Sequence, residues 1–159
     1  MDQNNEDARN QVKSKRILGI LIVIGIIVYG TIAAGSPGLT VGFDQENPVR
    51  YFYFQYSGRD VETVRYEIYL EDVISVSYVK EHQLGEMVDG VDTNAMTFGI
   101  WHNEAYGDYK LGIVDKIDSY VLVETKSGYA VLNYESDSTT EQLAKAIQEL
   151  ADETHGSAA

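Results

Sequence analysis

Residues that commonly carry catalysis are sparse in this sequence. The three histidines, His82, His102 and His155, share no metal-ligand spacing, and no Cys is present to act as a nucleophile or a thiolate ligand. No Gly-x-Ser-x-Gly sequence marks a serine nucleophile. We therefore predict no catalytic residue and no cofactor. An enzyme that uses acids around Trp101 is kept as a rival hypothesis.

One acidic stretch has the ligand chemistry of a cation site. Asp89, Asp92 and Asn94 place side-chain oxygens at nearly alternating positions, as calcium sites do. The stretch lacks the bidentate Glu and the fixed Gly of an EF-hand loop. These three residues are thus a weak candidate for a divalent-cation site, and the alternative is a solvated turn.

Aromatic residues are the stronger candidate for function. The chain has 12 Tyr, and Tyr51, Tyr53 and Tyr69 alternate with rows of Phe and Leu on strand-like segments. Aromatic side chains on an outward face favour protein recognition. We predict a partner-binding role for these three tyrosines and for Trp101. The alternative is that a linker or a long loop covers this second face of the strands.

An uncharged stretch near the N-terminus predicts a membrane anchor. Its 18 residues begin at Ile17 and end at Ala34, and they follow the basic residues Lys13, Lys15 and Arg16. At about 1.5 Å per residue a helix of this length spans roughly 27 Å, close to the hydrocarbon thickness of a bilayer. The basic flank predicts a cytoplasmic N-terminus and a C-terminal domain outside the cell membrane. A cleaved signal peptide and a buried soluble helix are the alternatives.

Charge narrows the range of partners. From residue 35 onward the chain has 8 Lys and Arg against 22 Asp and Glu, a net charge of −14. Such a surface is repelled by nucleic acid and by anionic headgroups. Nucleic acid is therefore excluded as a partner.

Hydrophobic patterning predicts one domain of short strands followed by one helix. Alternation indicates seven strands, at residues 51–56, 65–70, 73–79, 96–102, 108–114, 119–125 and 129–134, with a long loop over residues 81–95. Ser138 and Glu141 fit a capping box before an apolar helical stripe. The predicted divisions are a cytoplasmic tail (1–16), the span (17–34), a linker (35–48), the domain (49–153) and a disordered tail (154–159).

Seven strands before an amphipathic helix describe a small, partly open antiparallel barrel that the C-terminal α-helix caps. Three motifs then resemble the bacterial PH-like (pleckstrin-homology-like) domains found in membrane-anchored proteins: Leu70-Glu71-Asp72-Val73-Ile74, Phe98-Gly99-Ile100 before Tyr106-Gly107-Asp108-Tyr109-Lys110-Leu111, and Tyr120-Val121-Leu122-Val123-Glu124-Thr125. The resemblance covers about residues 66–150 and implies a scaffold rather than a chemistry.

Related domains often grip inositol phosphates with a basic loop between their first two strands. The corresponding residues 57–63 have one Arg against two acids, so an inositol phospholipid partner is not expected. Our leading hypothesis is a membrane-anchored, extracytoplasmic module that binds or assembles with a protein. The alternative is a domain that binds lipid or a cell-wall polymer.

Overall fold

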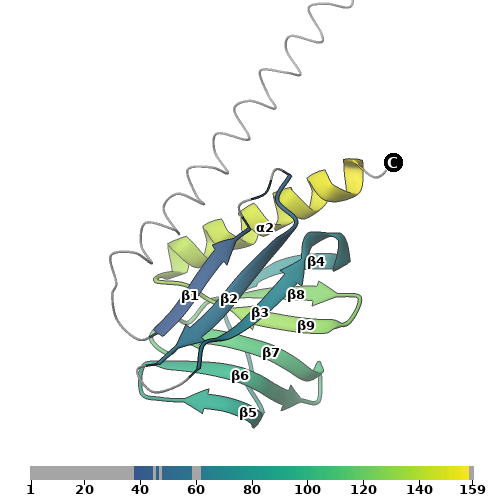
Figure 1. Cartoon of the computed structure of the whole chain (residues 1–159). Helices are drawn as coiled ribbons and strands as arrows, with labels where there is room; N and C mark the ends of the chain where they lie inside the picture. Colours follow the sequence, from purple (N-terminus) through teal and green to yellow (C-terminus); the bar gives the residue numbers. More distant parts are fainter. Residues whose placement is uncertain (1–37, 45, 47, 59–61, 158–159) are drawn as a thin grey trace, which may run out of the picture.

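The computed structural model describes residues 38–44, 46, 48–58 and 62–157, which form two β-sheets and a helix (Figure 1). The first sheet is an antiparallel meander of three strands, β1 (Gly38–Phe43), β2 (Tyr51–Ser57) and β3 (Val64–Tyr69). A short 3-10 turn, η1 (Leu70–Asp72), then leads into the second sheet. The expectation of a mainly β domain with a C-terminal helix is confirmed.

The second sheet has six strands in the order β4-β8-β9-β7-β6-β5. Its members are β4 (Val73–Val79), β5 (Glu86–Asp92), β6 (Met96–Asn103), β7 (Gly107–Val114), β8 (Tyr120–Thr125) and β9 (Gly128–Leu132). All neighbours in this sheet run antiparallel except β7 and β9, which are parallel. Because β4 and β5 occupy opposite edges, the chain between them has to cross one face of the sheet.

One hydrophobic core lies between the two sheets and the helix. Strand alternation turns Phe52 and Phe54 of β2 inward, where both side chains are fully buried. They meet the inner face of the six-stranded sheet, to which β8 contributes Val121 and Val123. The three-stranded sheet covers this face over β6 and β7, and the helix covers it over β4 and β8.

The helix α2 (Asp137–Ser157) buries the stripe that the sequence predicts. Leu143, Ile147 and Leu150 are all buried in the core beside β4, β8 and η1. The predicted capping box is displaced by two residues. The hydroxyl of Ser136, not of Ser138, accepts the hydrogen bond from the Thr139 backbone amide at 3.1 Å, so the helix begins earlier than its sequence signature indicates.

The predicted seven-stranded antiparallel barrel is wrong in its strand count and in one pairing. The described residues form nine strands, and the two additional strands are β1 and β5. Strand β5 lies in the stretch that the sequence predicts to be a loop. Six of its seven residues are exposed and Val91 alone is half-buried, so the strand shows no hydrophobic alternation. Its Gly90 faces Gly99 of β6, and a Cβ on Gly90 would lie 2.2 Å from the Phe98 carbonyl oxygen. This glycine permits a close backbone approach; it does not break the strand.

The ends of the predicted domain also change. Strand β1 begins at Gly38, inside the expected linker 35–48, and α2 continues through residues 154–157 of the expected tail. The predicted span at 17–34 lies outside the described residues. Within the part of the chain that the structure describes, no helix is both long enough and apolar enough to cross a bilayer.

Candidate functional site

The outer face of the three-stranded sheet gathers the tyrosines that the sequence nominates. Residues that alternate with the buried phenylalanines point away from the core, and the strand register sets Tyr51 opposite Tyr69 and Tyr53 opposite Glu67. The rings of Tyr51 and Tyr69 lie 5.4 Å apart, centroid to centroid. Tyr69 is 42 % exposed, whereas Tyr51 and Tyr53 are half-buried. Three of the four predicted partner-binding residues therefore share one surface.

Arg65 organises this surface. Its guanidinium carbon lies 3.6 Å from the ring centroid of Tyr53 and 5.7 Å from that of Tyr51. Its Nη2 donates a hydrogen bond to the Tyr51 hydroxyl at 3.4 Å, and its Nε pairs with a Glu67 carboxylate oxygen at 3.2 Å. We call Tyr51, Tyr53, Arg65, Glu67 and Tyr69 the Tyr/Arg face.

A glycine under one ring fixes the Tyr53 position. Gly42 of β1 pairs with Tyr53, and a Cβ at Gly42 would lie 2.6 Å from both the Cζ and the hydroxyl oxygen of that ring. The ring thus lies flat across the neighbouring strand and presents its other side to Arg65. A side chain at position 42 would clash with this ring and force it out of its place against the guanidinium.

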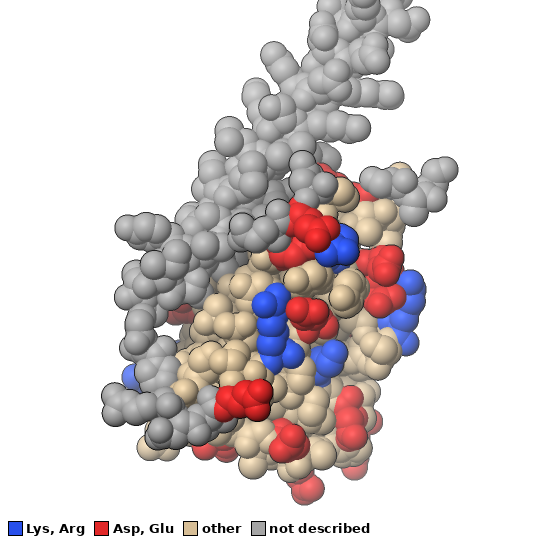
Figure 2. Space-filling view, viewed as in Figure 1, with Lys and Arg blue, Asp and Glu red and all other residues tan. Residues whose placement is uncertain are grey.

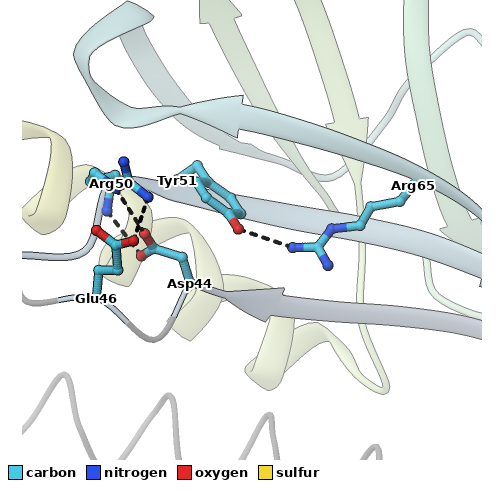
Figure 3. A network of polar contacts seen from close by, with 5 residues as sticks. All are labelled: Asp44, Glu46, Arg50, Tyr51 and Arg65. Atoms are coloured by element: carbon cyan, nitrogen blue, oxygen red, sulfur yellow. Dashed lines mark hydrogen bonds and ion pairs between the residues drawn. The ribbon is translucent and has the colours of Figure 1, made fainter.

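A second polar cluster borders the Tyr/Arg face at the turn between β1 and β2 (Figure 3). Arg50 pairs with Asp44 at 3.5 Å and with Glu46 at 2.7 Å. The Asp44 side chain is only 3 % exposed and also accepts the Arg50 backbone amide at 2.9 Å. The hydrogen bond goes to Asp44 Oδ1, whereas the buried Oδ2 has no hydrogen-bond partner in the described residues and only the ion pair with Arg50.

The surface charge around this face is mixed. In Figure 1 the three-stranded sheet lies in front of the six-stranded one, and Figure 2 keeps that view. Basic and acidic side chains alternate there among uncharged surface, with no continuous field of one sign. The face combines tyrosines with an arginine, and both residue types are enriched at protein interfaces.

Trp101 does not belong to this surface, and the prediction for it is corrected. It lies on β6, is 7 % exposed, and packs with Tyr109, Leu111 and other residues on the outer face of the six-stranded sheet. Its indole N–H has no hydrogen-bond partner in the described part of the chain. Strand parity explains the error: Trp101 points away from the core that Phe98 enters, but it meets a covering segment instead of solvent.

The acidic candidates for a cation site do not converge. Asp89 and Asp92 lie on an extended strand, three positions apart, so their side chains point to opposite faces. Asp92 instead accepts a hydrogen bond from the Thr97 hydroxyl at 2.9 Å, and Asn94 follows in the turn. No cluster of three or more His, Cys, Asp or Glu side chains able to hold a metal ion occurs among the described residues.

One residue of each outer face escaped sequence reasoning. Alternation places Arg65 on the outward face, where it pairs with Gln55 and lies diagonal to Tyr53; that diagonal position is the signal that it could stack on the Tyr53 ring. His82 carried no such signal, because its partners Tyr106, Tyr109 and Tyr120 come from three distant segments.

A small cavity opens elsewhere, at the β3 side of the space between the sheets. Its volume is about 130 Å³, and its lining includes Ile68, Asp108, Lys110 and Thr125. The Asp108 carboxylate already bonds the His102 ring nitrogen Nδ1 at 2.7 Å. Pockets that hold drug-sized molecules are usually about 300 Å³ or larger, so the Tyr/Arg face is the better candidate site.

Comparison with known proteins gives no relative. No family model, no curated protein and no solved structure matches this chain.

Proposed function

We propose that this protein is a membrane-anchored module that binds or assembles with a protein partner through the Tyr/Arg face. The observation that supports this proposal is the arrangement of three tyrosines around Arg65 on an outward sheet face. Tyr and Arg are the residue types that most often carry binding energy at the centre of protein interfaces, together with Trp. The proposal makes this face the contact surface.

The geometry reduces the entropic cost of binding. Arg65 is held before any partner arrives, by stacking on Tyr53, by its bond to Tyr51 and by its pair with Glu67. Ordering a long side chain on binding costs about 0.5–1.5 kcal/mol. Because Arg65 is already ordered in the free protein, binding a partner would require little of this cost. The partner we expect has basic groups at the rim of its contact surface, because the chain from residue 35 onward has a net charge of −14.

The anchor and the PH-like scaffold are the finer parts of the same proposal. A span at 17–34 leaves residues 35–37 before β1 begins at Gly38. Three extended residues reach roughly 10 Å, so the anchor would hold the domain close to the extracytoplasmic surface of the cell membrane. The C-terminal helix packed beside η1 supports a PH-like scaffold. The parallel β7–β9 pair and the two additional strands depart from the predicted barrel.

A reporter fusion tests the topology. A periplasmic-type phosphatase reporter fused after Ala159 is expected to be active, because the basic residues before Ile17 keep the N-terminus inside. A reporter that requires the cytoplasm, fused at the same point, is the matched control and is expected to be inactive. The opposite pair of results would contradict the proposed location.

Site-specific photo-crosslinking in intact membranes tests the binding role. A photoreactive residue at position 69 is expected to give a discrete protein adduct, and one at the exposed Lys145 of α2 is the matched control. Arg65→Ala should weaken the adduct at position 69. No adduct there, or equal adducts at both positions, would contradict the proposal. An adduct with the mass of a lipid or a polysaccharide would favour the alternative function.

A further inference from the structure

The connection between β4 and β5 crosses the outer face of the six-stranded sheet. Residues 80–85 join strands at opposite edges of that sheet, and the connection passes behind the sheet in Figure 1. Beneath it lies the second hydrophobic cluster, formed by Trp101, Tyr109, Leu111, Ile113 and Val131, against which Leu84 packs. A six-residue segment therefore lies over an apolar face that has no sheet or helix packed on it within the described residues.

His82 attaches the segment to a group of tyrosines. Its ring stacks on Tyr106, with centroids 5.6 Å apart and planes 13° from parallel, and meets the edge of Tyr109 at 5.5 Å. Tyr120 closes a third side at 5.8 Å. The three tyrosines come from the β6–β7 turn, from β7 and from β8, so the imidazole joins segments that are distant in sequence.

A chain of hydrogen bonds fixes which tautomer the neutral imidazole adopts. The Tyr109 hydroxyl donates to the Leu84 carbonyl at 2.5 Å, and its oxygen lies 3.1 Å from His82 Nε2. With its own proton committed to Leu84, the hydroxyl accepts from the imidazole, which fits the neutral form protonated at Nε2. Asn103 adds a separate bond from its Nδ2 to the Gln83 carbonyl at 2.9 Å. Three consecutive residues, 82–84, are thus tied to the sheet.

The surroundings of His82 disfavour a positive charge. Burial lowers the pKa of His82, and burial raises the pKa of Tyr109 to about 12, so the neighbouring hydroxyls stay neutral. The pKa of Tyr120 is raised by burial and by Asp118 and Asp115. Lys80 and Glu81 are the charged neighbours on the segment itself. None of the described carboxylates forms a hydrogen bond or ion pair with the imidazole.

The sign of the pH effect follows from the lowered pKa. An open segment exposes His82 to water, where it binds a proton near its ordinary pKa of about 6.5. The closed segment binds that proton only at lower pH. The closed state therefore loses stability as the pH falls from about 6.5 towards the lowered pKa of His82. Opening would also give the Trp101 indole N–H, which has no partner when closed, access to water.

We propose that residues 80–85 form a pH-dependent latch. With His82 neutral, the latch closes over the aromatic outer face of the six-stranded sheet; protonation of His82 releases it and exposes that face. The latch is independent of the Tyr/Arg face, because the two lie on different sheets. Histidine is the side chain whose ordinary pKa places such a switch near physiological pH.

Fluorescence of Trp101 tests the latch in the full chain, because it is the only Trp. Between pH 7.5 and pH 5 we expect a red shift of its emission and stronger quenching by acrylamide, with an unchanged far-UV circular dichroism spectrum. The midpoint should coincide with the pKa of the His82 imidazole measured by nuclear magnetic resonance, below 6.5. His82→Phe keeps an aromatic ring but cannot titrate, so its emission should not change with pH.

His102→Gln is the matched control, because the exposed His102 is the neighbour of Trp101 in the sequence and bonds Asp108. This variant should keep the transition. The proposal is overturned by emission that stays constant in the wild type, by a transition that persists in His82→Phe, or by one that is lost in His102→Gln. Loss of the circular dichroism signal at the same midpoint would also overturn it, because the whole domain would then be unfolding.

Discussion

Both sheets carry tyrosines on their outer faces, but among the residues that the structure describes only the face of the three-stranded sheet is left uncovered. On the three-stranded sheet, Tyr69 is 42 % exposed and its neighbours surround Arg65. On the six-stranded sheet, Tyr109 is 2 % exposed beneath residues 80–85. Both faces carry tyrosines, but the covered face adds apolar residues such as Leu111 and Ile113, whereas the open face adds Arg65 and Glu67.

Connection geometry explains the difference. The strands of the three-stranded sheet follow one another as hairpins, so their connections stay at the ends of the strands. Strands β4 and β5 are consecutive in sequence but occupy opposite edges, so their connection has to cross a face. The order of the strands in a sheet therefore decides whether a connection covers an aromatic face or leaves it exposed. Amino-acid composition does not reveal this order.

The largest loss of stability is expected from a substitution in the hydrophobic core between the two sheets and the helix. Ile147→Asp would bury a carboxylate among Leu143, Leu150 and the inner residues of β8, without a basic partner among its described core neighbours. Losing the packed side chain and burying an unpaired charge should lower the free energy of unfolding by about 3 kcal/mol or more. Thermal melting of the variant measures this change.

Lys145→Ala on the exposed side of the same helix is the matched control. Lys145 pairs with Glu141, four residues earlier at 2.7 Å, and such exposed pairs contribute about 0.3–0.5 kcal/mol. Comparable melting shifts for the two variants would show that α2 is not part of the core.

A smaller effect is expected at the covered face. Tyr109→Phe removes the hydroxyl that bonds the Leu84 carbonyl and His82 Nε2 while keeping the ring. Leaving these partners without their bond should cost about 1–3 kcal/mol, measurable by chemical denaturation. Tyr69→Phe, on the open face, is the control and should change stability by less than about 0.5 kcal/mol. Equal effects at both positions would show that the segment does not seal the outer face.

Individual strands with alternating hydrophobic residues were the features that the sequence predicted best. Segments with one buried face, such as Tyr120–Thr125 and the stripe through Ile147, were located correctly because burial imposes a period on the residues. Strand β5 lacked that period, since six of its seven residues are exposed, and β1 was obscured by Gly42, whose missing side chain accommodates Tyr53.

Part of the candidate site could also be predicted from local alternation. Tyr51, Tyr53 and Tyr69 lie on hairpin-connected strands, so local alternation was enough to place them together. The positions of Trp101 and His82 depend on the crossing of residues 80–85, and that crossing follows from long-range pairing of β8 and β9 between β4 and β7. No local pattern encodes such an insertion.

The smallest stability change is expected at the open face. Arg65→Ala removes a cation–π contact and a partly exposed ion pair with Glu67, which together contribute about 1 kcal/mol or less. The same variant should weaken partner binding strongly, because the guanidinium lies at the centre of the tyrosines. A loss of stability as large as that of Ile147→Asp would contradict a surface role for Arg65.

Hydroxyl-radical footprinting of Tyr69 and Tyr109 tests the central claim most directly, because it compares the same residue type on the two faces of one molecule. At pH 7.5 the detergent-purified full chain should be oxidised much faster at Tyr69 than at Tyr109. If the proposed partner occupies the Tyr/Arg face in native membranes, oxidation of Tyr69 should slow there while that of Tyr109 stays unchanged. Equal rates at the two tyrosines, or a Tyr69 rate that is the same with and without the native membrane, would contradict the account.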